Sequence, residues 1–155
     1  VKSIDRLDQL IQKKIKEVLR EAGLQEQVAR CQPVEGIGFL TAAALVMAFI
    51  RGEFKSSDSY IAFLGMDLRV SDSGQKNGRR RLTKRGCSEI RRLLHNAAMA
   101  ASRSAAWKGL YEQHRSSGKA TTQALVILAR KLARVAFALM KNQDEYVTKG
   151  AKLAC

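Results

Sequence analysis

The sequence lacks the features that mark membrane-spanning, secreted and metal-binding proteins. No apolar run approaches the roughly 18 residues of a membrane span, and the N-terminus has no charged-then-apolar signal pattern. The three cysteines, Cys31, Cys87 and Cys155, are odd in number and widely spaced, which fits neither a disulfide framework nor a zinc site. We therefore expect no metal site in this chain and a reducing cytoplasm as its compartment.

Acidic residues are also scarce. The 155 residues include 14 Asp and Glu against 28 Lys and Arg, a formal net charge of +14. Such an excess favours a polyanionic partner, nucleic acid first and an anionic membrane surface second. The acids are scattered, so no carboxylate cluster for two metal ions is evident. His95 and His114 stand alone on separate predicted helices, which is more typical of packed or surface histidines than of metal ligands.

Strand-like alternation is nearly absent, and Pro33 is the single proline. Ala, Leu, Arg and Lys dominate, so the sequence predicts an all-α fold. Residues 1–31 predict a long, coiled-coil-like connector helix, residues 32–142 a compact helical domain and residues 143–155 a flexible tail. The connector carries one apolar stripe, which either packs on the domain or pairs with a second chain. The stripe consists of Ile4, Leu7, Ile11, Ile15, Val18 and Ala22.

A glycine turn separates the first two predicted helical regions. Gly36 and Gly38 flank Ile37, and a strongly apolar helix follows. Helix, G-x-G turn and helix together resemble the helix-hairpin-helix motif, in which amides at the start of the second helix hold a DNA phosphate. The alternative is that the two glycines form only a turn.

A long polar loop is predicted over residues 67–86, and loops of this length are usually functional or disordered. It contains Ser71 and Ser73, followed by six basic residues: Lys76, Arg79, Arg80, Arg81, Lys84 and Arg85. A serine nucleophile needs a base or a setting that stabilises the charge developing on its substrate. The basic side chains can clamp a phosphate while Ser73 attacks phosphorus, with Gly74 bending the backbone and Asp72 orienting the loop or acting as a weak base. Alternatively, the basic residues hold backbone phosphates electrostatically and the serines do nothing covalent.

The basic residues of the last predicted helix are expected to form a solvated face. They are Arg130, Lys131 and Arg134.

Several stretches of the chain, taken together, resemble the C-terminal transposase domain of the IS-one-ten (Piv/MooV-type) family of insertion-sequence recombinases. The order and spacing match from about Pro33 to about Lys141. The stretches are "VEGIGFLTAAAL", "YIAFLGMDLRVSDSG", "RRRLTKRGCSEIRRLLHNAAMAASR" and "LYEQHRSSGKATTQALVILARKLARVAFALMK".

The resemblance implies a DNA recombinase in which a loop serine attacks the DNA backbone and forms a phosphoserine intermediate. The serine immediately before the loop glycine matches Ser73, with Ser71 as the fallback if the register slips by two. The resemblance also implies pairing of subunits through the connector helix into dimers and tetramers. Family members use a structured non-coding bridge RNA that pairs with target and donor DNA, and they act in the bacterial cytoplasm at the nucleoid.

The sequence departs from the family in one respect. The family's N-terminal half is a RuvC-like domain whose acidic residues bind a divalent metal, expected to be magnesium, and these 155 residues contain no such cluster. We therefore expect this chain to bind nucleic acid but not to recombine DNA alone. The competing interpretations are a non-catalytic helix-hairpin-helix module that binds nucleic acid, and a helical oligomerisation element.

Overall fold

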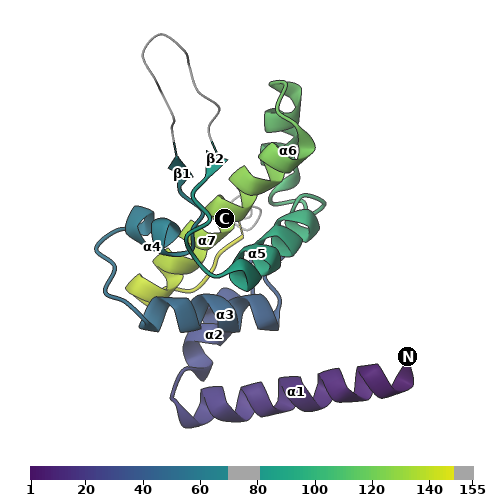
Figure 1. Cartoon of the computed structure of the whole chain (residues 1–155), viewed down its shortest axis with the longest axis vertical. Helices are drawn as coiled ribbons and strands as arrows, with labels where there is room; N and C mark the ends of the chain where they lie inside the picture. The colour runs from purple at the N-terminus through teal and green to yellow at the C-terminus, as the bar shows by residue number, and fades with distance from the viewer. Residues whose placement is uncertain (70–80, 149–155) are drawn as a thin grey trace, which may run out of the picture.

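The computed structural model describes residues 1–69 and 81–148, which form helices and one short hairpin (Figure 1). The predicted all-α fold class is confirmed, because the only strands in these ranges are two residues long. The helices are α1 (Lys2–Glu21), α2 (Gln25–Cys31), α3 (Phe39–Ile50), α4 (Ser57–Phe63), α5 (Ser88–Ala101), α6 (Lys108–Ser116) and α7 (Thr121–Asn142). The strands β1 (Leu68–Arg69) and β2 (Arg81–Leu82) pair antiparallel.

Helix α7 is the centre of the fold, and five other helices, α2 to α6, pack against it (Figure 1). Its buried residues recur every three or four positions, as the helical period requires for a stripe that faces a core. Helix α5 packs against α7 and buries the small side chains of Ala97, Ala98 and Ala101 in the core. The hairpin joins the opposite end of α5, just before Ser88.

The predicted single helix within residues 1–31 is wrong, because the chain breaks into α1 and α2. Gly23 has φ +68°, a left-handed conformation that ends α1. Helix α2 then buries Val28 and Cys31 in the core with α3 and α7. The break thus lets α2 pack on the domain while α1 extends away from it (Figure 1).

Helix α1 leaves most of its apolar stripe in solvent. Ile4, Leu7 and Ile11 are exposed, and Leu19 is the only buried residue among those of α1 whose side chains are described. No helix within the described ranges is long and apolar enough to cross a membrane. The division of the chain into connector, helical domain and tail stays a prediction, as does the coiled coil.

Residues after α7 return to the glycine turn. The Tyr146 hydroxyl donates a hydrogen bond of 2.6 Å to Glu35 Oε2, and the indole Nε1 of Trp107 donates to the same oxygen at 3.2 Å. Glu35 immediately precedes Gly36, so these bonds anchor the turn to the start of α6 and to the chain after α7. The sequence did not predict this contact for the segment that begins at residue 143.

This anchor predicts a pH dependence. Burial raises the pKa of Glu35, but hydrogen bonds from Tyr146, the backbone, Trp107 and Thr148 outweigh it and lower the pKa below its ordinary value of 4.5. A lowered pKa stabilises the folded state above pH 4.5, and that contribution is lost as the pH falls through the folded-state pKa. Urea unfolding should therefore show Glu35→Gln less stable than the wild type at pH 7, with a smaller difference near pH 3. A pH-independent difference would contradict this account.

Candidate nucleic-acid interface

The hairpin brings the two ends of the predicted serine loop together. Leu68 pairs with Leu82 and Arg69 with Arg81, so the chain leaves and re-enters the described structure at adjacent points. The predicted nucleophile and three of its basic neighbours lie between these points, outside the described residues. They are Ser73, with its alternative Ser71, and Lys76, Arg79 and Arg80. Their roles stay predictions.

Two glycines fasten the base of the hairpin to the end of α4. Gly65 has φ +70°, and a Cβ there would lie 2.9 Å from the amide nitrogen of Arg85. A Cβ on Gly86 would lie 2.5 Å from the carbonyl oxygens of Phe63 and Leu64. Because these neighbours are backbone atoms that cannot rotate away, the two chain segments fit only without side chains.

Hydrogen bonds complete this fastening. The Thr83 amide donates to the Asp67 carbonyl at 3.0 Å, and the Lys84 amide donates to the Gly65 carbonyl at 3.1 Å. The Thr83 hydroxyl also donates to the Asp67 carboxylate. Arg91 of α5 donates from Nη1 to the Gly86 carbonyl. The base of the hairpin is therefore held by the residues that flank its two strands and by α5.

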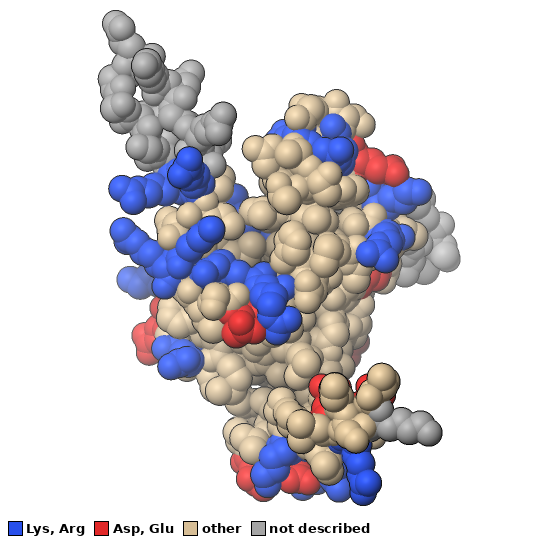
Figure 2. Space-filling view, turned by 45° about the vertical axis from the view of Figure 1, so that its right-hand side comes forward, with Lys and Arg blue, Asp and Glu red and all other residues tan. Residues whose placement is uncertain are grey.

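Four basic side chains surround the base of the hairpin. Arg81, Lys84 and Arg85, which the sequence predicted to bind phosphate, are exposed, and so is Arg69, which it did not single out. None of the four forms an ion pair with a described acidic residue. Lys and Arg predominate along the left-hand side of the molecule in Figure 2, below the hairpin, with few acidic side chains among them. The surface at the base of the hairpin thus suits a polyanion.

The glycine turn lies away from the hairpin. Gly36 has φ +90°, and a Cβ there would lie 2.8 Å from the Cβ of Ala101, in the last turn of α5. The hairpin instead joins the first turn of α5, through Gly86 and Cys87. A 14-residue helix is about 21 Å long, so the structure does not bring the predicted glycine contacts and the basic residues of the hairpin into one site.

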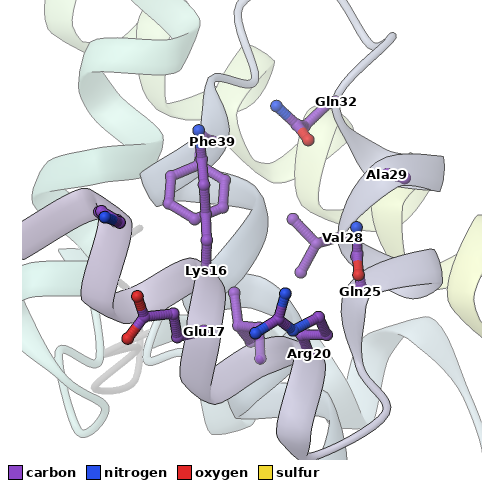
Figure 3. Close-up of a pocket in the computed structure, with 10 residues that line it drawn as sticks. Lys16, Glu17, Arg20, Gln25, Val28, Ala29, Gln32 and Phe39 are labelled. Carbon is purple, nitrogen blue, oxygen red and sulfur yellow. The ribbon is translucent and has the colours of Figure 1, made fainter. Parts of the chain in front are cut away.

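The two glycines of the turn differ in their surroundings. Gly36 makes a packing contact, whereas Gly38 is exposed, is the N-cap of α3, and has nothing within 4 Å of the point where a Cβ would lie. Lys16 of α1 lies beside this helix start, with Nζ 5.2 Å from the centre of the Phe39 ring. Figure 3 shows Lys16 and Phe39 lining a hollow of about 430 Å³ together with Glu17 and Arg20. Lys16 is a basic neighbour of the glycine turn that the sequence did not single out.

A second residue that sequence reasoning missed is Arg130. The sequence placed it on a solvated face, but the structure half-buries it in a groove beneath the hairpin. Arg134 likewise is not free in solvent, because Nη2 forms an ion pair of 2.5 Å with Asp58 Oδ1. No signal in the local sequence distinguishes these arginines from the exposed Lys131.

The divalent metal that the resemblance implies was expected in a RuvC-like domain and not among these residues. Within residues 1–69 and 81–148, no three His, Cys, Asp or Glu side chains lie together where they could hold an ion. We therefore assign no metal ligand among the residues that the structure describes.

Comparison with known proteins identifies the family. Residues 29–112, more than half of the chain, match the profile of the Transposase IS116/IS110/IS902 family. The transposase for insertion sequence element IS1111A of Coxiella burnetii (strain RSA 493 / Nine Mile phase I) is 31% identical over 131 residues, which cover 81% of this chain. The matched region is 36% of that relative, so the chain spans about a third of its length. The chain belongs to the IS116/IS110/IS902 family of transposases.

Proposed function

We propose that this chain is the DNA-binding domain of a transposase and carries the nucleophile, Ser73. The observation that supports the proposal most is the hairpin base, where strand pairing brings the ends of the serine loop together among exposed Arg69, Arg81, Lys84 and Arg85. A loop whose two ends are paired in this way can present a hydroxyl to a phosphate that is already held by cations. The relative from Coxiella burnetii is itself named a transposase.

In the proposed reaction, the Ser73 oxygen attacks a backbone phosphorus and forms a phosphoserine bond, while the bond from phosphorus to a deoxyribose oxygen breaks. The Ser73 hydroxyl gives up its proton, the departing oxygen takes one up, and a second DNA end reverses the step to join the strands and restore the serine. Negative charge builds on the equatorial phosphate oxygens during both transfers. The proposed clamp stabilises that charge and consists of Lys76, Arg79, Arg80, Arg81, Lys84 and Arg85.

The wider assembly is also part of the proposal. The exposed stripe of α1 suits pairing with a second copy, as in a dimer or tetramer on two DNA sites. A bridge RNA would supply sequence recognition, and a RuvC-like domain would supply magnesium ligands. The amides at the start of α3, beginning at Gly38, would hold a duplex phosphate near Lys16. We place the protein at the nucleoid because its substrate would be chromosomal DNA.

The electrostatic part of the proposal predicts a change in salt dependence. Replacing Arg81, Lys84 and Arg85 together by Gln should weaken DNA binding and lower the slope of log affinity against log salt by roughly 0.9 for each phosphate that is no longer neutralised. A matched triple replacement of Arg6, Lys13 and Lys14 removes the same charge from α1, which lies at the opposite end of the molecule (Figure 1). Titrations at several salt concentrations compare the two variants.

Equal effects of both triple variants on affinity would mean that only net charge matters. That result would contradict a phosphate clamp at the base of the hairpin. Wild-type affinity that does not change with salt would favour a helical oligomerisation element, because counterion release accompanies any binding through phosphates.

A further inference from the structure

The groove beneath the hairpin contains a cation that the described protein leaves partly unpaired. The groove has a volume of about 370 Å³, within the range of small-ligand sites. Leu68 and Leu82 of the hairpin form one wall, and Val126 and Ile127 of α7 form the other. Arg130 and Lys119 supply the positive charge, and no acidic side chain lines the groove in the described part of the chain.

Arg130 is an unusual residue within this groove. Its Nε is buried and has no hydrogen-bond partner among the described residues. The carboxylate of Asp58 is already bonded to Arg134, one helical turn further along α7. Burial, followed by the charge of Arg134, lowers the pKa of Arg130 against the weaker opposing charges of Asp58 and Asp67, and a guanidinium remains protonated at physiological pH. A buried donor without an acceptor destabilises a fold, and because Arg130 also lines the groove, a ligand there can bring an acceptor to its guanidinium.

We propose that this groove binds one nucleotide of a DNA strand, with its phosphate accepting hydrogen bonds from Arg130. The inference rests on the proposed function, because the strand attacked at the serine loop would continue into the groove at the foot of the same hairpin. The planar guanidinium suits bidentate phosphate binding, and Lys119 adds a second charge at the rim. The apolar walls contact the sugar and the base, which have no charge to solvate.

The groove's surroundings favour DNA over a protein segment. The apolar walls alone would accept either one, but a protein occupant would have to place a carboxylate at Arg130. Arg69 and Arg81, the exposed neighbours in the hairpin of the groove-lining Leu68 and Leu82, would repel most cationic partners and attract a continuing phosphate backbone. Arg130 thus extends the basic surface of the hairpin base across to α7, 49 positions beyond Arg81 in the chain.

The test compares Arg130→Gln with Lys131→Gln, which removes the same charge from the exposed neighbouring position of the same helix. Binding to fluorescent single-stranded and duplex oligodeoxynucleotides is measured with the full chain. We expect Arg130→Gln to weaken binding of at least one of them about tenfold, with Lys131→Gln changing it less than about twofold. The form whose binding Arg130→Gln weakens more shows whether the groove takes a free strand or one strand of a duplex.

Thermal unfolding separates ligand binding from a structural role. Because Arg130 carries a buried donor without a described partner, Arg130→Gln should keep or raise the melting temperature while affinity falls. Arg130→Lys keeps the positive charge but loses the planar guanidinium that donates two parallel hydrogen bonds. It should therefore retain only part of the wild-type affinity. A second readout scans one neutral methylphosphonate linkage along the oligonucleotide. Neutralising one particular linkage should weaken DNA binding by the wild type but not by Arg130→Gln.

Three results would overturn the inference: unchanged DNA affinity in Arg130→Gln, equal losses of affinity in Arg130→Gln and Lys131→Gln, or a fall in melting temperature that accounts for the weaker binding. Unchanged affinity would indicate that a protein segment, and not DNA, occupies the groove. If the triple variant of Arg81, Lys84 and Arg85 still loses binding in that case, only the groove proposal fails. If the wild type itself binds no DNA, the proposed function fails with it.

Discussion

Ser73→Ala in the full-length protein is expected to abolish strand exchange and to change DNA affinity less than about twofold. The methyl group cannot form a bond to phosphorus, so the loss of exchange should be at least about 10³-fold. Affinity should persist because the cations at the hairpin base, and not the hydroxyl, hold the phosphates. Recombination between two DNA molecules that carry element ends measures the first quantity, and an equilibrium titration measures the second.

Ser71→Ala is the matched control, because it removes the same hydroxyl two positions earlier in the loop. It should retain exchange, and a covalent protein–DNA adduct that survives denaturation should be present in Ser71→Ala and absent in Ser73→Ala. The reverse pattern would move the nucleophile to Ser71. Full strand exchange in both variants would favour the non-catalytic interpretation, in which neither serine attacks DNA. This chain alone should form no adduct, so a Ser73-dependent adduct would contradict the expectation that it is inactive by itself.

Gly36→Ala is expected to lower the free energy of unfolding by about 3 kcal/mol, from two causes. Part of this loss is the cost of φ +90° for a residue with a side chain. The rest comes from overlap of the new methyl group with the backbone and side chain of α5, where Ala101 Cβ would be 2.8 Å away. Urea unfolding monitored by far-ultraviolet circular dichroism measures the change.

Gly38→Ala is the control for Gly36→Ala, because it adds the same methyl group two residues later. Its φ is −79° and nothing lies within 4 Å of the added methyl group, so stability should change by less than about 1 kcal/mol. If both variants are equally stable, the turn does not pack on α5 as the structure places it. If Gly38→Ala also binds duplex DNA like the wild type, the exposed amides of α3 still suffice for the proposed phosphate contact.

The helices α5 and α7 could be predicted because their apolar residues repeat with the period of a helix. That pattern exists in the local sequence and needs no knowledge of the partner surface. The division between α1 and α2 could not be predicted in the same way. Gly23 is a weak signal within an amphipathic pattern, and the break depends on Val28 and Cys31 packing in a core that residues from α3 and α7 complete.

The glycine turn shows the same limit at a single residue. The sequence suggested that Gly36 and Gly38 act alike, as amides that face a phosphate. The structure separates them, because the atoms nearest to a Cβ on Gly36 belong to Ala97 and Ala101, more than sixty positions away in the chain. Only the folded packing of α5 determines which glycine has room for a side chain.

The basic character of the candidate site follows from the chain order, since Arg81, Lys84 and Arg85 are close neighbours in sequence and need only a shared turn to form one surface. The same holds for the helical class and the net charge, both of which depend on local pattern or composition. Tertiary structure decided the fastening of Gly65 to Gly86, the pairing of Arg69 with Arg81 and the half-burial of Arg130. Each of these depends on contacts between distant segments, and such contacts form only when the burial of a shared core offsets the entropy of closing the chain between them.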